Sequence, residues 1–334
     1  MTKIYNRRWI SLVVLVCQTT SLVLLLRYSR TVNSEKYVPS TAIMIAEFLK
    51  GIVCIFLVWL ENDRSINRVI LLINKEIYNK PYDTMKLAIP SGLYAIQNNL
   101  LFIALSYLNA ATFQVTYQLK LLTTALFSVF MLRKNIEKCQ WLSLFMLAFG
   151  VTLVIWPIPD ELNKHLTAQN QATWLQQMMG FCAVLVSTVT SGFVGVYFEK
   201  IVNTEQTSIW VRNIQLAIFG TVFGLLIVFC FDYKAIMDKG FFQGYTTIVW
   251  IVIFFQAIGG LVVGTVIKYA DRNIRIFATF LSILFLSVIS YFVLHDLTPT
   301  LFFYIGTMYV LTATFLYAWG KPIVTLWTTN QVRI

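Results

Sequence analysis

The feature that most constrains this chain is a series of apolar runs, each close to the length that crosses a lipid bilayer. The runs cover approximately residues 8–27, 41–60, 86–108, 110–132, 139–157, 174–198, 207–231, 246–270, 274–295 and 299–319. A membrane-spanning helix needs about 17–25 predominantly apolar residues, because its backbone groups must bond to one another inside the hydrocarbon. The sequence therefore predicts an all-α integral membrane protein of about ten transmembrane helices, forming a single transmembrane domain over residues 1–334.

The composition agrees with this prediction and argues against nucleic acid as a partner. Only 12% of the residues are charged and 58% are hydrophobic, whereas a soluble domain carries about 25% charged residues. The net charge of +11 would point to nucleic acid in a soluble protein. Here the basic residues gather in the short links between apolar runs, where they set membrane orientation. We therefore expect the lipid bilayer, and no nucleic acid, as the surroundings.

The basic residues are distributed unevenly between the two sides of the expected bundle. With an even number of spans, about 17 Lys and Arg residues fall on the side of the two termini and about six on the other side. The smaller set is Arg27, Arg30, Lys36, Lys164, Lys234 and Lys239. Cytosolic links carry the excess of positive charge in membrane proteins. Both termini are therefore predicted to be cytosolic, with a cytosolic tail over residues 320–334.

One stretch, residues 94–132, is apolar enough to enter a membrane yet carries several polar side chains. These include Gln97, Asn98, Asn99, Gln118 and the full positive charge of Lys120. Polar groups at membrane depth are expensive and usually mark a substrate or ion pathway. We predict a binding site here. The alternative is that Lys120 only forms an internal ion pair, for example with Glu47 or Glu199.

Further candidates for this site are aromatic and charged. Tyr94 and Tyr117 are able to stack on a nucleobase, and the neighbouring amides Gln97, Asn98, Asn99 and Gln118 are able to bond its edge or a ribose. Glu47 and Lys50, three residues apart in the second run, share one helix face. Two interpretations of this pair stay open. Either the two side chains only pair with each other, or Lys50 adds positive potential while Glu47 contacts a sugar.

The fourth run resembles the ninth. LKLLTTALFSVF, from Leu119, aligns with IRIFATFLSILF, from Ile274, which matches Lys120 with Arg275. Because the two runs are five helices apart, a repeat of five spans would be inserted upside down. We therefore predict two inverted five-helix repeats, about residues 8–157 and 174–319, with a site near the midplane. Lys120 and Arg275 together suit a diphosphate, although Arg275 is close enough to a helix end to reach the membrane surface instead.

The sequence offers little for a metal centre or a catalytic one. It has two histidines, five scattered cysteines and carboxylates that are mostly single. A membrane-bound transferase, the alternative class of function, usually needs paired carboxylates to hold metal-bound phosphates. We therefore predict no cofactor, no metal site and no enzymatic activity.

Five segments resemble a known family in the same order along the chain. They are QNNLLFIALSYLNAATFQVTYQLKLLTTALFSV, GVYFEK, WVRNIQL, FFQGY and IKYAD. Together they are similar to the nucleotide-sugar transporters of the drug/metabolite transporter superfamily, over nearly the whole chain. QTTSLVLLLRYSRT and NKPYDTMKLAIPSG resemble most the branch that carries UDP-N-acetylglucosamine, and the branch for UDP-galactose is the nearest neighbour.

The resemblance implies ten helices in two inverted halves, both termini in the cytosol, and residence in the Golgi membrane or the endoplasmic reticulum. It implies an antiporter that exchanges a cytosolic UDP-sugar for lumenal UMP. UDP-N-acetylglucosamine is the first expectation; UDP-galactose or several UDP-sugars is the alternative. It also implies ligand contacts by Lys120, Tyr117, Asn98 and Asn99. A homodimer, or a complex with Golgi glycosyltransferases, is a further expectation.

The chain departs from the family pattern at one place. After IKYAD the family continues with N-I-L-K-G-F-A-T-S, whereas this chain has RNIRIFATF. Arg275 keeps the positive charge, but Ile276 and Phe280 are bulkier than the family's glycine and serine. We expect these two residues to change the sugar end of the site, so the resemblance does not determine the sugar.

Overall fold

The computed structural model describes residues 2–31, 37–156, 174–202, 208–269, 272–294 and 300–329. Within these ranges, the side chains of residues 2–9, 11, 202, 263–269, 272–277 and 319–329 lie outside the description. Every element in the described ranges is helical, and they contain no strand.

The helices follow the predicted apolar runs. The long ones are α1 (Thr2–Thr31), α2 (Pro39–Glu61), α5 (Ala88–Tyr107), α8 (Lys138–Ile155), α10 (Trp174–Val202), α11 (Ile209–Phe231), α13 (Thr247–Tyr269), α14 (Arg272–Ile289) and α15 (Leu301–Thr329). The fourth run is divided into α6 (Ala110–Thr116), a 3₁₀ turn (Tyr117–Leu119) and α7 (Lys120–Leu132). Eight described segments are long and apolar enough to span a membrane, and two shorter apolar ones, Thr247–Val262 and Ala278–Leu294, lie in the eighth and ninth runs. The prediction of an all-α multi-pass membrane protein is confirmed.

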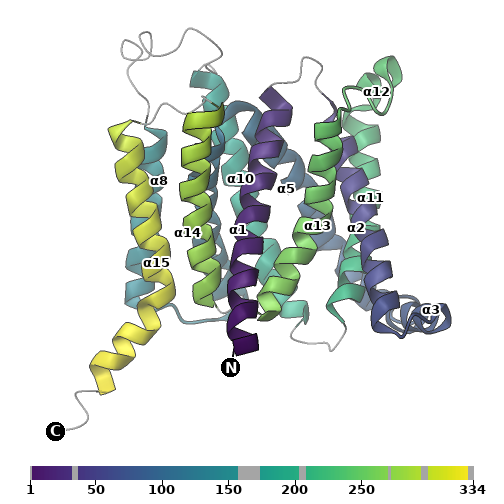
Figure 1. Cartoon of the computed structure of the whole chain (residues 1–334), viewed down its shortest axis with the longest axis horizontal. Coiled ribbons are helices and arrows are strands. Elements are labelled where there is room, and N and C mark those ends of the chain that lie inside the picture. The colour runs from purple at the N-terminus through teal and green to yellow at the C-terminus, as the bar shows by residue number, and fades with distance from the viewer. Residues whose placement is uncertain are drawn as a thin grey trace.

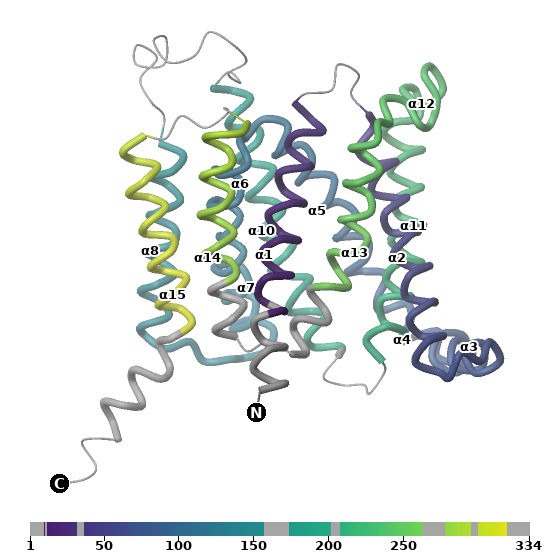
Figure 2. The backbone as a smooth tube through the Cα atoms, viewed as in Figure 1, coloured from purple at the N-terminus to yellow at the C-terminus, as the bar shows by residue number. Residues whose placement is uncertain are grey.

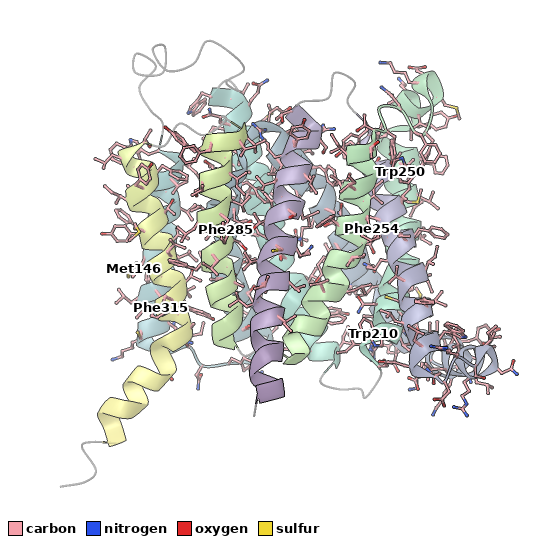
Figure 3. The ribbon with its side chains drawn as sticks, viewed as in Figure 1. Met146, Trp210, Trp250, Phe254, Phe285 and Phe315 are labelled. Carbon is pink, nitrogen blue, oxygen red and sulfur yellow. The ribbon has the colours of Figure 1, made fainter. Side chains whose placement is uncertain are left out.

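The helices stand side by side, and the start of α1 lies at the same end of the bundle as the end of α15 (Figures 1 and 2). We call this the terminal end, and the end where α1 stops and α2 begins the distal end. The outer surface carries large apolar side chains, as a lipid-facing surface must. Trp250, Phe254, Phe285 and Phe315, labelled in Figure 3, are each about half exposed.

The link between α2 and α5 forms short helices at the terminal end, beside α2 and α11 (Figure 1). They are α3 (Ile66–Ile73), a π-helical turn (Asn74–Tyr78) and α4 (Pro81–Lys86). The periodic apolar residues of this link predict an amphipathic surface helix, and α3 confirms it. Val69 is buried, whereas Ile66 and Ile70 are exposed. On the distal side, α12 (Tyr233–Lys239) precedes α13.

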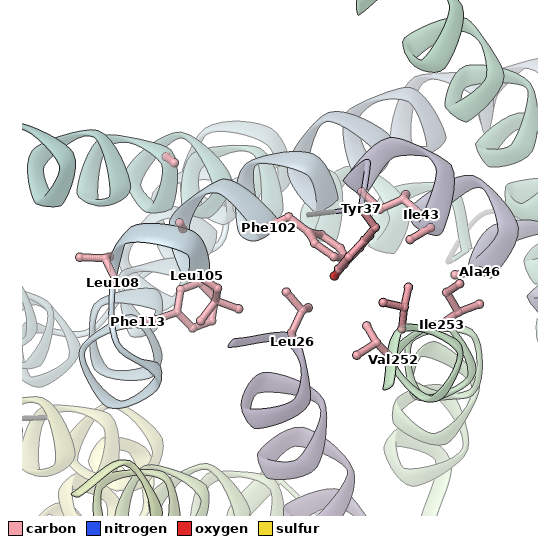
Figure 4. Close-up of a cluster of buried hydrophobic side chains, with 14 of the residues drawn as sticks. Leu26, Tyr37, Ile43, Ala46, Phe102, Leu105, Leu108, Phe113, Val252 and Ile253 are labelled. Atoms are coloured by element: carbon pink, nitrogen blue, oxygen red, sulfur yellow. The ribbon is translucent and has the colours of Figure 1, made fainter. Parts of the chain in front are cut away.

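At the distal end, one apolar cluster joins helices from both halves of the chain. It contains, among others, Leu26 of α1, Ile43 of α2, Phe102 of α5, Phe113 of α6 and Val252 of α13, together with Tyr37 (Figure 4). The Tyr245 hydroxyl, next to this cluster, is 2.9 Å from that of Thr41. Burial raises the pKa of Tyr245 to about 12, so this hydroxyl stays protonated at physiological pH. Helices from both halves of the chain therefore pack against one another near the distal end.

The largest helix interface pairs α8 with α15. Gly150 and Gly306 bring their backbones into contact there: a Cβ added to Gly306 would lie 2.6 Å from the Gly150 carbonyl oxygen. Small residues permit such close crossings of membrane helices.

We therefore expect Gly306→Val to lower stability by about 1–3 kcal/mol, the usual cost of overpacking. Thermal unfolding of the purified protein in detergent measures this effect. Gly195→Val is the matched control, because nothing lies within 4 Å of a Cβ added at Gly195. Equal melting temperatures for the two variants would contradict the expectation.

Candidate functional site

The fourth span contains a 3₁₀ turn at the YQLK sequence. The helix α6, capped by the Asn109 side chain through a 2.7 Å bond from the Thr112 amide, ends at Thr116, and α7 begins at Lys120. The predicted span over residues 110–132 is present as Ala110–Leu132, with a 3₁₀ turn at residues 117–119. A short 3₁₀ stretch within a helix often marks a functional position. Lys120 directly follows this turn, as the first residue of α7.

The Lys120 ammonium group contacts an aromatic ring and no described carboxylate. Its Nζ atom is 4.9 Å from the centroid of the Tyr117 ring, and the Phe113 ring stacks against Tyr117 with a centroid distance of 5.5 Å. The alternative that Lys120 pairs with Glu47 or Glu199 is wrong: Glu47 pairs with Lys50, and Glu199 pairs with Lys134 at 2.6 Å. Among the described residues, no carboxylate forms an ion pair with Lys120.

Tyr117 is itself held by two neighbouring helices. Gln97 of α5 donates from Nε2 to the Tyr117 hydroxyl at 3.1 Å, and that hydroxyl donates to Ser191 of α10 at 3.5 Å. The helix α10 comes this close because Gly192 lacks a side chain, and a Cβ there would be 2.8 Å from the Thr123 backbone. Sequence reasoning missed Ser191, since a lone serine in an apolar run carries no distinguishing signal.

Gln97 carries an unused acceptor. It is 5% exposed, and its Oε1 atom is buried without a hydrogen-bond partner in the described part of the chain. A buried polar atom without a partner costs about 1–3 kcal/mol. A ligand that donates a hydrogen bond would recover this cost.

The pair Glu47–Lys50 on α2 lies between two other helices. Each side chain is 14% exposed. The Glu47 carboxylate lies against Gly220 of α11, where a Cβ would be 2.7 Å from Oε2, and the Lys50 stem lies against Gly260 of α13. Tyr94 of α5 lies three residues before Gln97 and so shares its helix face. Glu47 and Lys50 thus pair with each other in the structure.

Asn98, Asn99 and Gln118 are also predicted site residues. Asn98 is half-buried on α5. Asn99 donates to the Ala95 carbonyl of its own helix at 2.9 Å, and the buried Gln118 donates to the Gln114 carbonyl at 3.2 Å. These bonds commit one donor of each amide to the helix itself.

The Arg275 end of the predicted site is only partly described. Arg275 and Ile276 fall in the first turns of α14, and their side chains lie outside the described residues. Phe280 packs in an apolar cluster with Val115 and Leu147, among others. The described residues contain no group of three or more His, Cys, Asp or Glu side chains that could hold a metal ion.

The chain matches one family profile and is similar to several known proteins. The family profile described as nucleotide-sugar transporter matches residues 4–318. The chain is 51% identical to the UDP-N-acetylglucosamine transporter of Rattus norvegicus, over 95% of this chain and 97% of that protein. It is 48% identical to a UDP-N-acetylglucosamine/UDP-N-acetylgalactosamine transporter of Caenorhabditis elegans, over 93% of each chain. It is 42% identical to the UDP-galactose translocator of Bos taurus, over 93% of this chain and 77% of that one.

Proposed function

Since the chain belongs to the nucleotide-sugar transporter family, we propose that it is an antiporter that exchanges a cytosolic UDP-sugar, in the first place UDP-N-acetylglucosamine, for lumenal UMP. The membership identifies a transporter and removes the membrane-bound transferase as an alternative. UDP-galactose, or several UDP-sugars, is the second candidate, favoured by the 42% identity to a UDP-galactose translocator.

The observation that carries the proposal is the state of Lys120. A lysine inside a transmembrane bundle needs an anion or water, and here the described residues provide a tyrosine ring but no carboxylate partner. A diphosphate brings the missing negative charge, and Tyr117 and Tyr94 provide aromatic surface for its nucleoside.

The helix interfaces support the two inverted repeats that antiport by alternating access would use. Suppose that α1 corresponds to α10, α2 to α11, α5 to α13, α6–α7 to α14, and α8 to α15. The contact of α1 with α13 then corresponds to that of α10 with α5, and the contact of α1 with α14 to that of α10 with α7. The contact of α2 with α13 corresponds to that of α11 with α5. All six contacts are present. The pairings α2 with α11 and α8 with α15 map onto themselves. Such a neighbour pattern is expected of two halves related by a pseudo-two-fold axis.

The proposal includes an orientation and a compartment. The excess of basic residues at the terminal end favours the cytosolic side for that end. UMP is the product left after a glycosyltransferase uses a UDP-N-acetyl sugar and a phosphatase cleaves the UDP, so the exchange fits the Golgi membrane or the endoplasmic reticulum.

The test is uptake by proteoliposomes that contain the purified protein and are preloaded with UMP. We expect them to accumulate labelled UDP-N-acetylglucosamine faster than vesicles preloaded with CMP or with buffer. External UDP-galactose, CMP-sialic acid and GDP-mannose measure selectivity. If folded protein exchanges no uridine nucleotide sugar for UMP, the proposal is wrong.

A further inference from the structure

A second group of polar side chains lies between α1 and α13, apart from the Lys120 group. Gln256, on α13, has an Oε1 atom that is buried and has no hydrogen-bond partner among the described residues. Gln18, on α1, is 8% exposed, and its amide nitrogen occupies the space that a Cβ on Gly259 would need. The missing side chain at Gly259 thus makes room for the Gln18 amide.

These two amides are continuous with the α2 ion pair. Gln256, Gly259 and Gly260 are three and four residues apart on α13, so they share one helix face. Gly259 faces Gln18, and Gly260 faces the Lys50 stem, whose ammonium pairs with Glu47. Gln18 and the Lys50 stem therefore meet α13 at neighbouring glycines, about one turn from Gln256.

Gln256 also corresponds to Gln97 in position. Gln97 is the tenth residue of α5 and Gln256 the tenth residue of α13, and α5 and α13 are equivalent in the proposed repeats. In both glutamines the Oε1 atom is buried and has no hydrogen-bond partner in the described ranges of the chain. Only Gln97 belongs to the group around Lys120, through its bond to Tyr117. If the nucleotide phosphates bind Lys120, the Gln256 group is left for the other end of the ligand.

The chemistry of two carboxamides suits one substituent of an N-acetylated sugar. A 2-acetamido group has one N–H donor and one carbonyl acceptor, which complement the carbonyl and the amino group of glutamine. The 2-hydroxyl of a galactose or glucose unit is a single polar atom and has no donor and acceptor on separate atoms as the acetamido group has. We propose that Gln256 and Gln18, beside Gly259 of α13, bind the acetamido group and so select UDP-N-acetyl sugars. This inference rests on the proposed UDP-sugar exchange.

The test compares binding of UDP-N-acetylglucosamine, UDP-galactose and UMP by the purified full-length protein and its Gln256→Leu and Gln18→Leu variants. We expect each variant to bind UDP-N-acetylglucosamine about 10- to 100-fold more weakly, the effect of losing a buried hydrogen bond. UMP and UDP-galactose affinities should change by no more than about 3-fold. UDP-N-acetylgalactosamine should lose as much as UDP-N-acetylglucosamine, because the two share the acetamido group.

Two further variants complete the design. Gly259→Ala moves the Gln18 amide without removing it, and we expect the same selective loss. Gln243→Leu, in the loop before α13, is the control and should bind all ligands as the unchanged protein does. Retained UMP binding shows that a variant is folded. If both glutamine variants keep their preference for the acetamido sugar, or lose all three ligands equally, the inference is wrong. If the unchanged protein binds no uridine nucleotide, the proposed function fails instead.

Discussion

Lys120→Ala is expected to reduce UDP-sugar exchange at least about 100-fold, since a charge-assisted contact to phosphate is among the strongest that a side chain makes. The substitution removes a cation that forms no ion pair with a described carboxylate, so it leaves no buried acid without its partner. We therefore expect the melting temperature without ligand to be unchanged or higher, because a charge inside the membrane is costly in itself. Exchange in UMP-loaded proteoliposomes and thermal unfolding in detergent measure the two effects.

Two controls make the Lys120 experiment specific. Lys134→Ala removes another lysine close in the sequence, which is exposed and pairs with Glu199, and exchange should be unaffected. Lys120→Arg keeps the charge but changes its shape, and we expect an intermediate rate. UMP should also stabilise the unchanged protein against heat but not the Lys120→Ala variant. Normal exchange by Lys120→Ala would refute a phosphate-binding role for this residue.

Glu47→Leu is expected to have the largest effect on stability. The pair Glu47–Lys50 is mostly buried, and removal of one partner leaves the other charge uncompensated, which costs about 3–5 kcal/mol. The double variant Glu47→Leu, Lys50→Met should recover most of this loss, because neutral residues of similar size often replace a buried ion pair at little cost. Thermal unfolding of the single and double variants tests the expectation. A double variant as unstable as Glu47→Leu would contradict it.

The same double variant separates the two roles that the sequence leaves open for this pair. If the pair only holds α2 against its neighbours, the stable double variant keeps its exchange rate. If Lys50 contributes positive potential to the ligand, exchange falls while stability is kept. We expect the second result, because the Lys50 stem lies on Gly260, beside the Gln18 and Gln256 group.

The position of the site could be predicted from the sequence, but its internal contacts could not. Lys120, Tyr117, Gln97 and Tyr94 stand out because polar residues are rare in spans, and the structure places Lys120 on Tyr117 and Gln97 at the Tyr117 hydroxyl. The spacing of Glu47 and Lys50 offers their mutual pair as one of two interpretations, and the structure contains this pair. The surroundings of Lys120 were not predictable, since Glu47 and Glu199 were both possible partners. Only the tertiary structure shows that Glu199 pairs with Lys134 and that Lys120 lies on the Tyr117 ring.

The 3₁₀ turn in the fourth span could not be predicted from the sequence either. Tyr117, Gln118 and Leu119 include no proline or glycine, the usual causes of a helix interruption. Their 3₁₀ turn arises where Tyr117 is bound from two sides by α5 and α10. Gln18 and Gln256 were overlooked for a related reason. Each is a single amide in its own apolar run, and only the tertiary structure shows that the Gln18 amide lies at Gly259, three residues from Gln256 on α13.

The sequence by itself determined that the chain is a multi-pass helical membrane protein, because hydrophobic length and backbone hydrogen bonding in lipid leave no other solution. It also determined the family, through motifs in order along the chain. Tertiary structure decided which polar groups have a partner within the described part of the protein and which have none. That distinction depends on distances of a few ångströms between helices far apart in the sequence, and no local pattern of residues encodes such distances.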